Sequence, residues 1–185
     1  LTTRVLLSQL KAIKDEVSIP LIFMGYLNPI MHYGYEQFFT DLNDSGVSGV
    51  IIPDLTFDDY LNIVKPIADR HDIRVIMMIT PETSDDRVKF IDDNTDGFIY
   101  MVSSASVTGA QKEFDKKKVA YFNHINSMKL RNPRMIGFGI SNKQTLDSAR
   151  QNAAGAIIGS KFVNLLIETK DPDSALDKLM ETLEE

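Results

Sequence analysis

Residues Met135–Val163, MIGFGISNKQTLDSARQNAAGAIIGSKFV, contain two short apolar runs that each stop at a glycine before a helical pattern begins. Glycine lets the backbone approach a ligand closely, and the helix that follows adds the positive end of its dipole. Two such turns in succession predict a phosphate-binding cup made of backbone N–H groups. Glycines that only permit tight turns explain the spacing equally well.

Apolar runs of the same kind occur throughout the chain. Before this stretch they are LIFMGY, GVIIPD, VIMMIT and GFIYMVS, which begin at Leu21, Gly49, Val75 and Gly97. The runs are continuous rather than alternating, which is typical of parallel strands buried on both faces. Strands that alternate with helices predict an α/β fold, either an open doubly wound sheet or a barrel.

Local signals predict where several helices begin or break. Ser84 and Ser141 are the predicted N-caps of two helices. Pro66 lies inside an apolar stripe and is predicted to kink or shorten that helix. The first and last predicted helices have apolar sides formed by Val5, Leu6, Leu10 and Ile13 and by Leu176, Leu179, Met180 and Leu183.

The length of the chain bears on the choice between the two architectures. A closed eight-stranded barrel takes about 250 residues, whereas this chain has 185 residues and begins on a predicted helix. We therefore expect an N-terminally incomplete barrel. Residues 1–185 are predicted to form a single domain containing strands three to eight, with the first two βα units largely missing.

Composition excludes several classes of function. The net charge is −6, and the longest basic run, Lys116–Lys118, is too short for a nucleic-acid footprint and is predicted to be a solvated helix face. No apolar stretch approaches the roughly 18 residues of a membrane span, and no signal peptide opens the chain. The absence of cysteine excludes disulfides and thiolate chemistry and favours a cytoplasmic location.

The titratable residues provide no clear catalytic group. Asp54 ends a predicted strand, the usual position of a catalytic carboxylate in a barrel, but it could equally cap the turn that follows. The histidines show no metal-ligand spacing, so no metal site is predicted. The acidic pairs are predicted to be solvated: Asp58 with Asp59, Asp85 with Asp86, and Asp92 with Asp93.

Small polar residues suggest how a phosphate site would be completed. The loops after the seventh and eighth strands of barrels frequently bind phosphate, and the binding interpretation uses the amides of Phe138, Gly139, Gly159 and Ser160. A loop rich in Ser, Thr, Ala and Gly follows another strand, as expected of a segment that closes over a ligand. Its residues Thr108 and Gly109 are ligand candidates, and Tyr100 lies inside that strand, either pointing into a pocket or simply buried.

Five ordered motifs resemble the tryptophan synthase alpha-subunit family over essentially the whole chain. They are PLIFMGYLNPIMHYG, GVIIPDL, GFIYMVSSASVTG, GFGIS and GAIIGS. The resemblance implies a (βα)8 TIM barrel and a lyase that cleaves indole-3-glycerol phosphate to indole and glyceraldehyde 3-phosphate by a retro-aldol step. It implies no cofactor in this chain, but a partner in an alpha2-beta2 complex: the pyridoxal-phosphate-dependent beta subunit.

The resemblance also implies roles for particular residues. Tyr100 lines the substrate pocket, and Thr108 helps close the site over the substrate. The segment from Asn28 to Gly34 and the turn from Pro53 to Leu55 face the beta subunit, so Asn28, Pro53, Asp54 and Leu55 are interface candidates. The phosphate is bound by Gly109, Phe138, Gly139, Gly159 and Ser160.

The chain departs from the family pattern at three points. Ser106 replaces the first glycine of the loop motif GVTG, and Thr56 follows PDL where the family commonly has proline. The family's two catalytic carboxylates, a glutamate and an aspartate, belong upstream of Leu1. We therefore expect this chain alone to be inactive, with none of its own residues catalytic.

Two alternatives remain from the sequence. Another phosphate-binding barrel enzyme, such as a sugar-phosphate isomerase or epimerase, would share the two glycine turns, although MGYLNPI and SVTG argue against it. A non-catalytic activator of a beta-like subunit would bind the partner without lyase activity.

Overall fold

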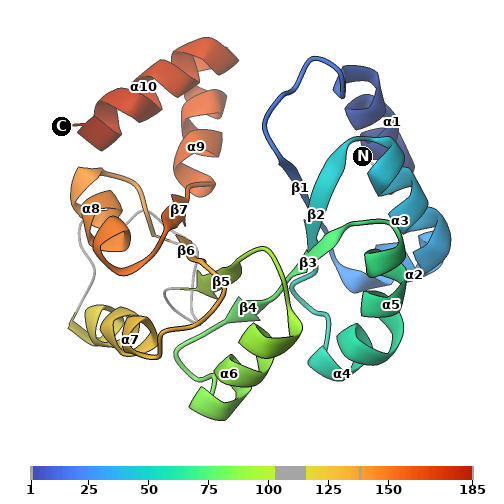
Figure 1. Cartoon of the computed structure of the whole chain (residues 1–185). Helices are drawn as coiled ribbons and strands as arrows, with labels where there is room; N and C mark the ends of the chain where they lie inside the picture. Colours follow the sequence, from blue (N-terminus) through green and yellow to red (C-terminus); the bar gives the residue numbers. More distant parts are fainter. Residues whose placement is uncertain (1, 103–115, 138, 185) are drawn as a thin grey trace. The chain divides into compact units, whose positions relative to one another are not determined.

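The computed structural model describes residues 2–102, 116–137 and 139–184, in which helices alternate with short parallel strands (Figure 1). Contacts divide the chain into two compact units, Leu1–Met77 with Asn94–Gly97 and Met78–Asp93 with Phe98–Glu185. Each unit has a parallel sheet of its own. The predicted alternation of strands and helices is therefore confirmed.

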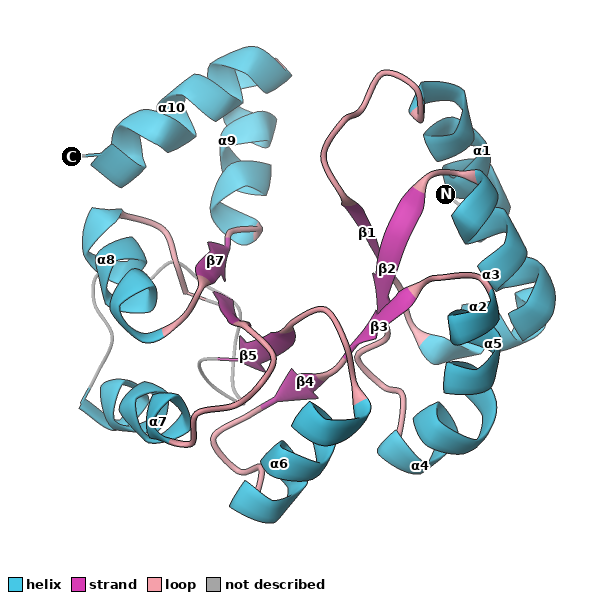
Figure 2. Cartoon of the chain, viewed as in Figure 1, coloured by secondary structure: helices cyan, strands magenta, loops and turns pink. Residues whose placement is uncertain are grey.

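The first unit has a three-stranded sheet in the order β1-β2-β3, with its helices on one face (Figure 2). Its strands are β1 (Leu21–Met24), β2 (Val47–Ile51) and β3 (Arg74–Ile76). Its helices are α1 (Thr3–Ile13), α2 (Leu27–Tyr33), α3 (Tyr35–Asp44), α4 (Phe57–Asp59), the π-helical turn η1 (Tyr60–Val64) and α5 (Lys65–Arg70). The last residues of the three strands are in register, so the loops after them leave from one edge of the sheet.

The second unit has a four-stranded sheet in the order β4-β5-β6-β7. Its strands are β4 (Met78–Ile79), β5 (Ile99–Val102), β6 (Arg134–Gly137) and β7 (Gly155–Ile157). Its helices are α6 (Asp85–Asn94), α7 (Lys116–Ser127), α8 (Lys143–Asn152), α9 (Ser160–Thr169) and α10 (Pro172–Glu184). The predicted C-terminal helix is confirmed as α10, which packs Ala175 and Leu179 against Leu165 of α9.

The run VIMMIT, predicted as one strand, forms parts of two. Val75 and Ile76 belong to β3, which pairs with β2, whereas Met78 and Ile79 form β4, which pairs with β5. The run is uniformly apolar, so its composition could not reveal that its two halves pair within different sheets.

The prediction that the strands are buried on both faces is wrong for β1. Phe23 is 7% exposed and packs edge-to-face against Phe38 of α3, with 5.5 Å between the ring centroids. Its neighbours Ile22 and Met24 are 39% and 51% exposed. Successive side chains of a strand point to opposite faces, so only the face of β1 that carries Phe23 is buried. β5, in contrast, is buried along its whole length.

One of the two predicted N-caps is confirmed and the other is wrong. The Ser84 hydroxyl oxygen accepts a hydrogen bond from the Arg87 N–H at the start of α6, at 3.4 Å. The N-cap of α8 is Asn142 rather than Ser141. Asn142 Oδ1 accepts from the Thr145 N–H at 2.9 Å, and Thr145 Oγ1 accepts from the Asn142 N–H at 3.3 Å. This reciprocal pair is a capping box that uses threonine in place of the usual glutamate or glutamine.

Pro66 does not shorten the helix, contrary to one of the two predicted outcomes. α4, η1 and α5 follow one another without a gap from Phe57 to Arg70, and Pro66 lies in the first turn of α5. Proline has no N–H to donate to the carbonyl four residues earlier, and its ring crowds that carbonyl. The wider π-helical turn therefore lies directly before the proline, and Tyr60 and Val64 in this turn stay buried.

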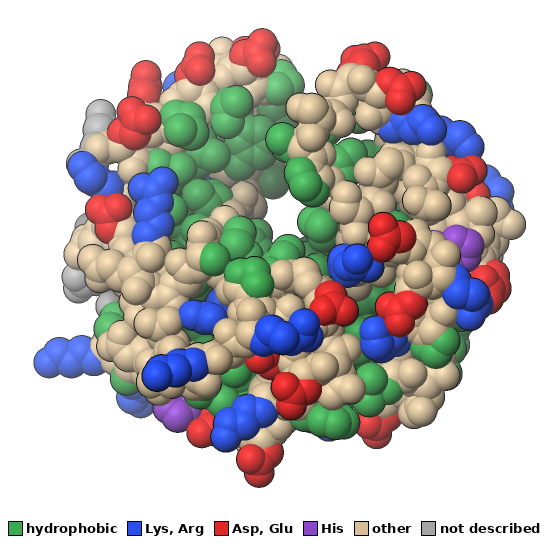
Figure 3. All heavy atoms as spheres, in the orientation of Figure 1, with side chains coloured by type: hydrophobic (Ala, Val, Ile, Leu, Met, Phe, Trp, Pro, Cys, Tyr) green, Lys and Arg blue, Asp and Glu red, His purple; other side chains and the backbone are tan. Residues whose placement is uncertain are grey.

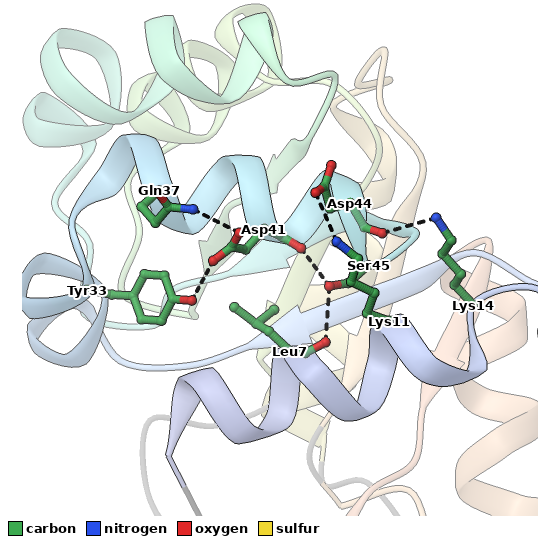
Figure 4. A network of polar contacts seen from close by, with 8 residues as sticks. All are labelled: Leu7, Lys11, Lys14, Tyr33, Gln37, Asp41, Asp44 and Ser45. Atoms are coloured by element: carbon green, nitrogen blue, oxygen red, sulfur yellow. Dashed lines mark hydrogen bonds and ion pairs between the residues drawn. The ribbon is translucent and has the colours of Figure 1, made fainter.

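Polar contacts connect α1 to α3 and the residue after it (Figure 4), and the predicted apolar side of α1 is only partly covered, since Leu6 and Leu10 are half-buried. The predicted residues Val5 and Ile13 are 45% and 41% exposed, whereas Leu7 is 3% exposed. The Ser45 hydroxyl donates to the Leu7 carbonyl at 3.1 Å, and Lys11 forms an ion pair with Asp44 at 3.1 Å. The helix was predictable from the pattern, but its orientation depends on these contacts to α3 and the residue after it.

The prediction that the acidic pairs are solvated is wrong for Asp92, which is 5% exposed at the end of α6. Its carboxylate accepts hydrogen bonds from the N–H groups of Arg131, at 2.6 Å, and Asn132, at 2.8 Å. Asn132 Nδ2 donates to the same carboxylate at 2.9 Å. A buried carboxylate needs such donors, so Asp92 attaches α6 to the turn before β6.

Charged side chains of both signs are interspersed on the face drawn in Figure 3. Lys116 and Lys117, at the start of α7, are exposed, as predicted for a solvated helix face. Within the described residues, no helix combines the length and the apolar character needed to cross a bilayer.

Candidate substrate-binding site

The two glycine turns leave the sheet of the second unit at the same level. Gly137 at the end of β6 is paired with Ile157 at the end of β7. Gly139 and Gly159 therefore each lie two residues beyond a paired position. On the other side of β6, Val102 at the end of β5 is also paired with Gly137. The register thus brings the ends of all three strands to one edge, as expected for an anion site formed by neighbouring loops.

The two glycines differ in conformation and exposure: Gly139 is half-buried and Gly159 is exposed. Gly139 has a φ of +88°, which only glycine adopts without strain. Gly159 is the exposed N-cap of α9, and it provides no side-chain cap for that helix. A methyl group added at Gly159 would meet nothing within 4 Å. The first N–H groups of α9, including that of Ser160, have no acceptor within the helix itself, so they can be donated to an anion.

Tyr100 lies in β5 and is buried, at 5% exposure. Its ring crosses the neighbouring strand at Gly137, where a methyl group would lie 2.3 Å from both Cε2 and the hydroxyl oxygen of the tyrosine. Burial raises the pKa of the Tyr100 hydroxyl to about 12, so the group is neutral and can donate a hydrogen bond at physiological pH. The sequence identified Tyr100 as a candidate but did not single out Gly137. Gly137 is the first glycine of the GFG motif, and this motif could have indicated it.

Several predicted site residues lie outside the described residues. These are Thr108 and Gly109 of the loop after β5, with Ser106 of the same loop, and Phe138 between the two glycines of GFG. Their places in the site remain predictions. Of the residues predicted to bind the phosphate, the structure describes Gly139, Gly159 and Ser160.

The predicted partner-facing residues lie in the first unit, after β1 and β2. Asn28, Pro53 and Asp54 are exposed, whereas Leu55 is 7% exposed. Because Leu55 is buried within the chain, its side chain is not available to a partner in this structure.

Asp54 does not cap the turn that follows it. Its Oδ1 accepts a hydrogen bond from the Leu27 N–H of α2, at 2.8 Å. The following helix, α4, is capped instead by Thr56, whose Oγ1 accepts from the Asp59 N–H at 3.1 Å. The Thr56 departure from the family pattern therefore supplies a helix cap.

Two further features lie away from the strand ends. A surface groove of about 710 Å³ is lined by the N-cap and exposed side of α8 and by Thr182 of α10, but by none of the predicted site residues. The described residues contain no group of three or more His, Asp or Glu side chains that could hold a metal ion.

The sequence of this chain is similar to those of proteins of known family. The sequence profile described as tryptophan synthase alpha chain matches residues 1–185. The chain belongs to the tryptophan synthase alpha chain family. It is 59% identical over 184 residues to the tryptophan synthase alpha chain of Phocaeicola vulgatus, covering 99% of this chain and 71% of the relative. It is 55% identical to that of Parabacteroides distasonis, covering 100% of this chain and 72% of the relative.

Solved structures of tryptophan synthase chains have the same fold as this chain. The alpha chain of Legionella pneumophila subsp. pneumophila superposes with a TM-score of 0.85 and 26% identity, covering 99% of this chain and 68% of that one. A chain of the tryptophan synthase complex of Pyrococcus furiosus superposes with a TM-score of 0.83 and 27% identity, covering 100% and 72%. The fold is therefore that of the tryptophan synthase alpha TIM barrels, as the resemblance implied.

Proposed function

We propose that this chain binds indole-3-glycerol phosphate at the carboxyl ends of β5, β6 and β7, for the lyase reaction of the tryptophan synthase alpha family. In that reaction a retro-aldol step releases indole and glyceraldehyde 3-phosphate for tryptophan biosynthesis. The observation that carries the proposal is the common register of Gly139 and Gly159 beyond the paired residues Gly137 and Ile157.

The phosphate is bound by backbone groups in this proposal. The N–H groups of Gly139, Gly159 and Ser160 and the Ser160 hydroxyl donate to its oxygens, and the N-terminal end of α9 adds a favourable dipole. An anion can approach closely at Gly159, because the space beside its α carbon is open. Phe138 and Gly109 complete the phosphate site.

The remaining substrate contacts come from β5 and the loop that follows it. Tyr100 lines the substrate pocket, and Thr108 helps close the site over the substrate. The carboxylates that the family uses for proton transfer match no residue of this sequence. The residues of this chain therefore bind the substrate, and none of them is assigned a proton-transfer role.

We also propose a partner, a pyridoxal-phosphate-dependent tryptophan synthase beta subunit in an alpha2-beta2 complex. The solved Pyrococcus furiosus neighbour comes from a tryptophan synthase complex. Asn28, Pro53 and Asp54 are exposed in the loops after the paired strands β1 and β2 and are the candidate contacts of this partner. A cytoplasmic location is proposed on the absence of cysteine.

Calorimetric titration of the chain with indole-3-glycerol phosphate, glycerol 3-phosphate and indole tests the binding site. We expect Gly159→Ala to weaken binding of both phosphates by about tenfold or more, because the added methyl group occupies the space of the anion. Ser160→Ala removes one hydroxyl donor and should cost about threefold to tenfold. Both variants should bind indole as the parent does.

Ser18→Ala, an exposed serine of the first unit, is the matched control and should bind all three compounds as the parent does. Unchanged phosphate affinity in Gly159→Ala would contradict the assignment of the site. Tighter binding of simple sugar phosphates than of indole-3-glycerol phosphate would favour an isomerase or epimerase instead.

A further inference from the structure

The loops after β1 and β2 are joined by one hydrogen bond between residues 27 positions apart in the chain. Asp54 Oδ1 accepts from the Leu27 N–H at 2.8 Å. Met24 and Ile51, the last residues of the two strands, are paired. The N–H of Gly25, the next residue after β1, donates a hydrogen bond to the Ile51 carbonyl at 3.1 Å. Leu27 and Asp54 each lie three residues past the paired position, so parallel pairing brings them to the same level.

This carboxylate takes the place of a local cap for α2. The N-cap residue, Tyr26, makes no side-chain capping hydrogen bond. Pro29 in the first turn has no N–H, so only Leu27 and Asn28 carry first-turn donors before the helix begins to bond internally. A negative charge at this end also interacts favourably with the helix dipole. Asp54 is therefore the group that stabilises the start of this seven-residue helix.

Asn28 follows directly on the bonded amide, at an exposed position of the first turn. Its backbone carbonyl accepts a hydrogen bond from His32 Nδ1 at 3.0 Å, and Ile30, two residues on, is 1% exposed and fixes α2 to the core. Among the residues that the structure describes, the Asn28 side-chain amide has no hydrogen-bond partner. The backbone of Asn28 is thus held on both sides while its amide faces outward.

We infer that Asp54 is a positioning residue: its bond to the Leu27 N–H fixes the first turn of α2 and so presents the Asn28 amide to the beta subunit. This inference rests on the partner named in the proposed function. It separates two roles that the sequence grouped together, because Asn28 contacts the partner whereas Asp54 acts through Asn28. An ordered polar group loses less conformational freedom on binding than a mobile one, which favours the complex.

Hydrogen exchange of the Leu27 amide, measured by NMR on the chain, tests the structural half. Asp54→Ala should speed exchange at Leu27 by about tenfold, the effect of losing a hydrogen bond to a charged acceptor. Because the substitution is 27 positions away, it leaves the intrinsic exchange rate of that amide unchanged. Asp54→Asn keeps an Oδ1 acceptor and should restore much of the protection. Asp58→Ala, an exposed carboxylate of α4, is the matched control and should change nothing.

A mutant cycle on affinity for a tryptophan synthase beta subunit tests the functional half. Asp54→Ala and Asn28→Ala should each weaken binding by about fivefold to tenfold, and the double variant should bind no more weakly than Asn28→Ala alone. Additive effects, or weaker binding without faster Leu27 exchange, would show that Asp54 contacts the partner directly and overturn the inference. Failure of the unsubstituted chain to bind the beta subunit would refute the partner proposal itself, whereas intact binding that neither variant changes would refute only the positioning role.

Discussion

The ring of Tyr100 lies against the α carbon of Gly137 on the neighbouring strand, so closely that a methyl group there would stand 2.3 Å from the tyrosine hydroxyl. The two residues belong to β5 and β6, whose ends carry the loops of the proposed substrate site. A glycine at position 137 is therefore what allows a large aromatic ring to cross the sheet at this point.

Gly137→Ala should destabilise the chain by about 1–3 kcal/mol, because the buried ring has to move. In a Tyr100→Leu background the same substitution should cost at least about 1 kcal/mol less, since the smaller side chain leaves room for the methyl group. Urea unfolding of the four chains in the cycle measures this coupling. Equal costs in both backgrounds would show that the ring does not set the requirement for glycine.

Asp92→Ala should lower the free energy of unfolding by about 3 kcal/mol, because it leaves the buried N–H of Asn132 and the part-buried N–H of Arg131 without their acceptor. Asp93→Ala is the adjacent control and should change stability by less than about 0.5 kcal/mol, since Asp93 is exposed. Urea unfolding compares the two variants. A similar cost for both would mean that the Asp92 contacts contribute little.

Thr56→Ala should cost about 1 kcal/mol through loss of the N-cap of α4. Thr56→Ser keeps the hydroxyl that accepts from the Asp59 N–H and should be close to the parent. Thermal unfolding measures both changes. If alanine and serine behave alike, the hydroxyl does not stabilise this helix start.

Alkaline pH should destabilise the chain through its buried tyrosines. Burial raises the folded-state pKa of Tyr100 to about 12, above the usual value of about 10, so the folded chain holds this proton more tightly than the unfolded chain. The resulting stability is present below about pH 10 and is lost as pH rises toward about 12, with a maximum near 3 kcal/mol. Burial also raises the pKa of Tyr60 and Tyr121, which act in the same direction.

Tyr100→Phe tests the contribution of this one hydroxyl. Urea unfolding at about pH 9 and about pH 11 should show a smaller loss of stability for the variant than for the parent. An equal loss in both chains would assign the alkaline transition to other groups.

Apolar periodicity predicted where the helices form better than it predicted which of their side chains are buried. α1 and α10 formed where the apolar spacing indicated, because spacing of three and four residues places apolar side chains on one side of a helix. Which residues become buried was harder to predict. Leu7 is buried while Val5 and Ile13 are exposed, because Ser45 bonds the Leu7 carbonyl and orients α1 on α3.

Hydrogen bonds between residues far apart in the chain could not be predicted from the sequence. The sequence predicted that Asp92 is solvated and that Asp54 is either a catalytic carboxylate or a cap of its own turn. In the structure one accepts from residues 39 and 40 positions later and the other from an amide 27 positions earlier. A side chain's nearest sequence neighbours do not reveal which backbone groups folding brings to it.

By itself, the sequence determined the alternation of strands and helices, the two glycine turns and the family, because these depend on residue type and local spacing. Only the tertiary structure decided that Gly139 and Gly159 leave paired strands at one level, that Tyr100 requires Gly137, and that Asp54 caps α2 rather than its own turn. Each of these is a relationship between segments far apart in the chain. The register of the parallel strands brings those segments together, and the register follows from the packing of whole elements rather than from any single motif.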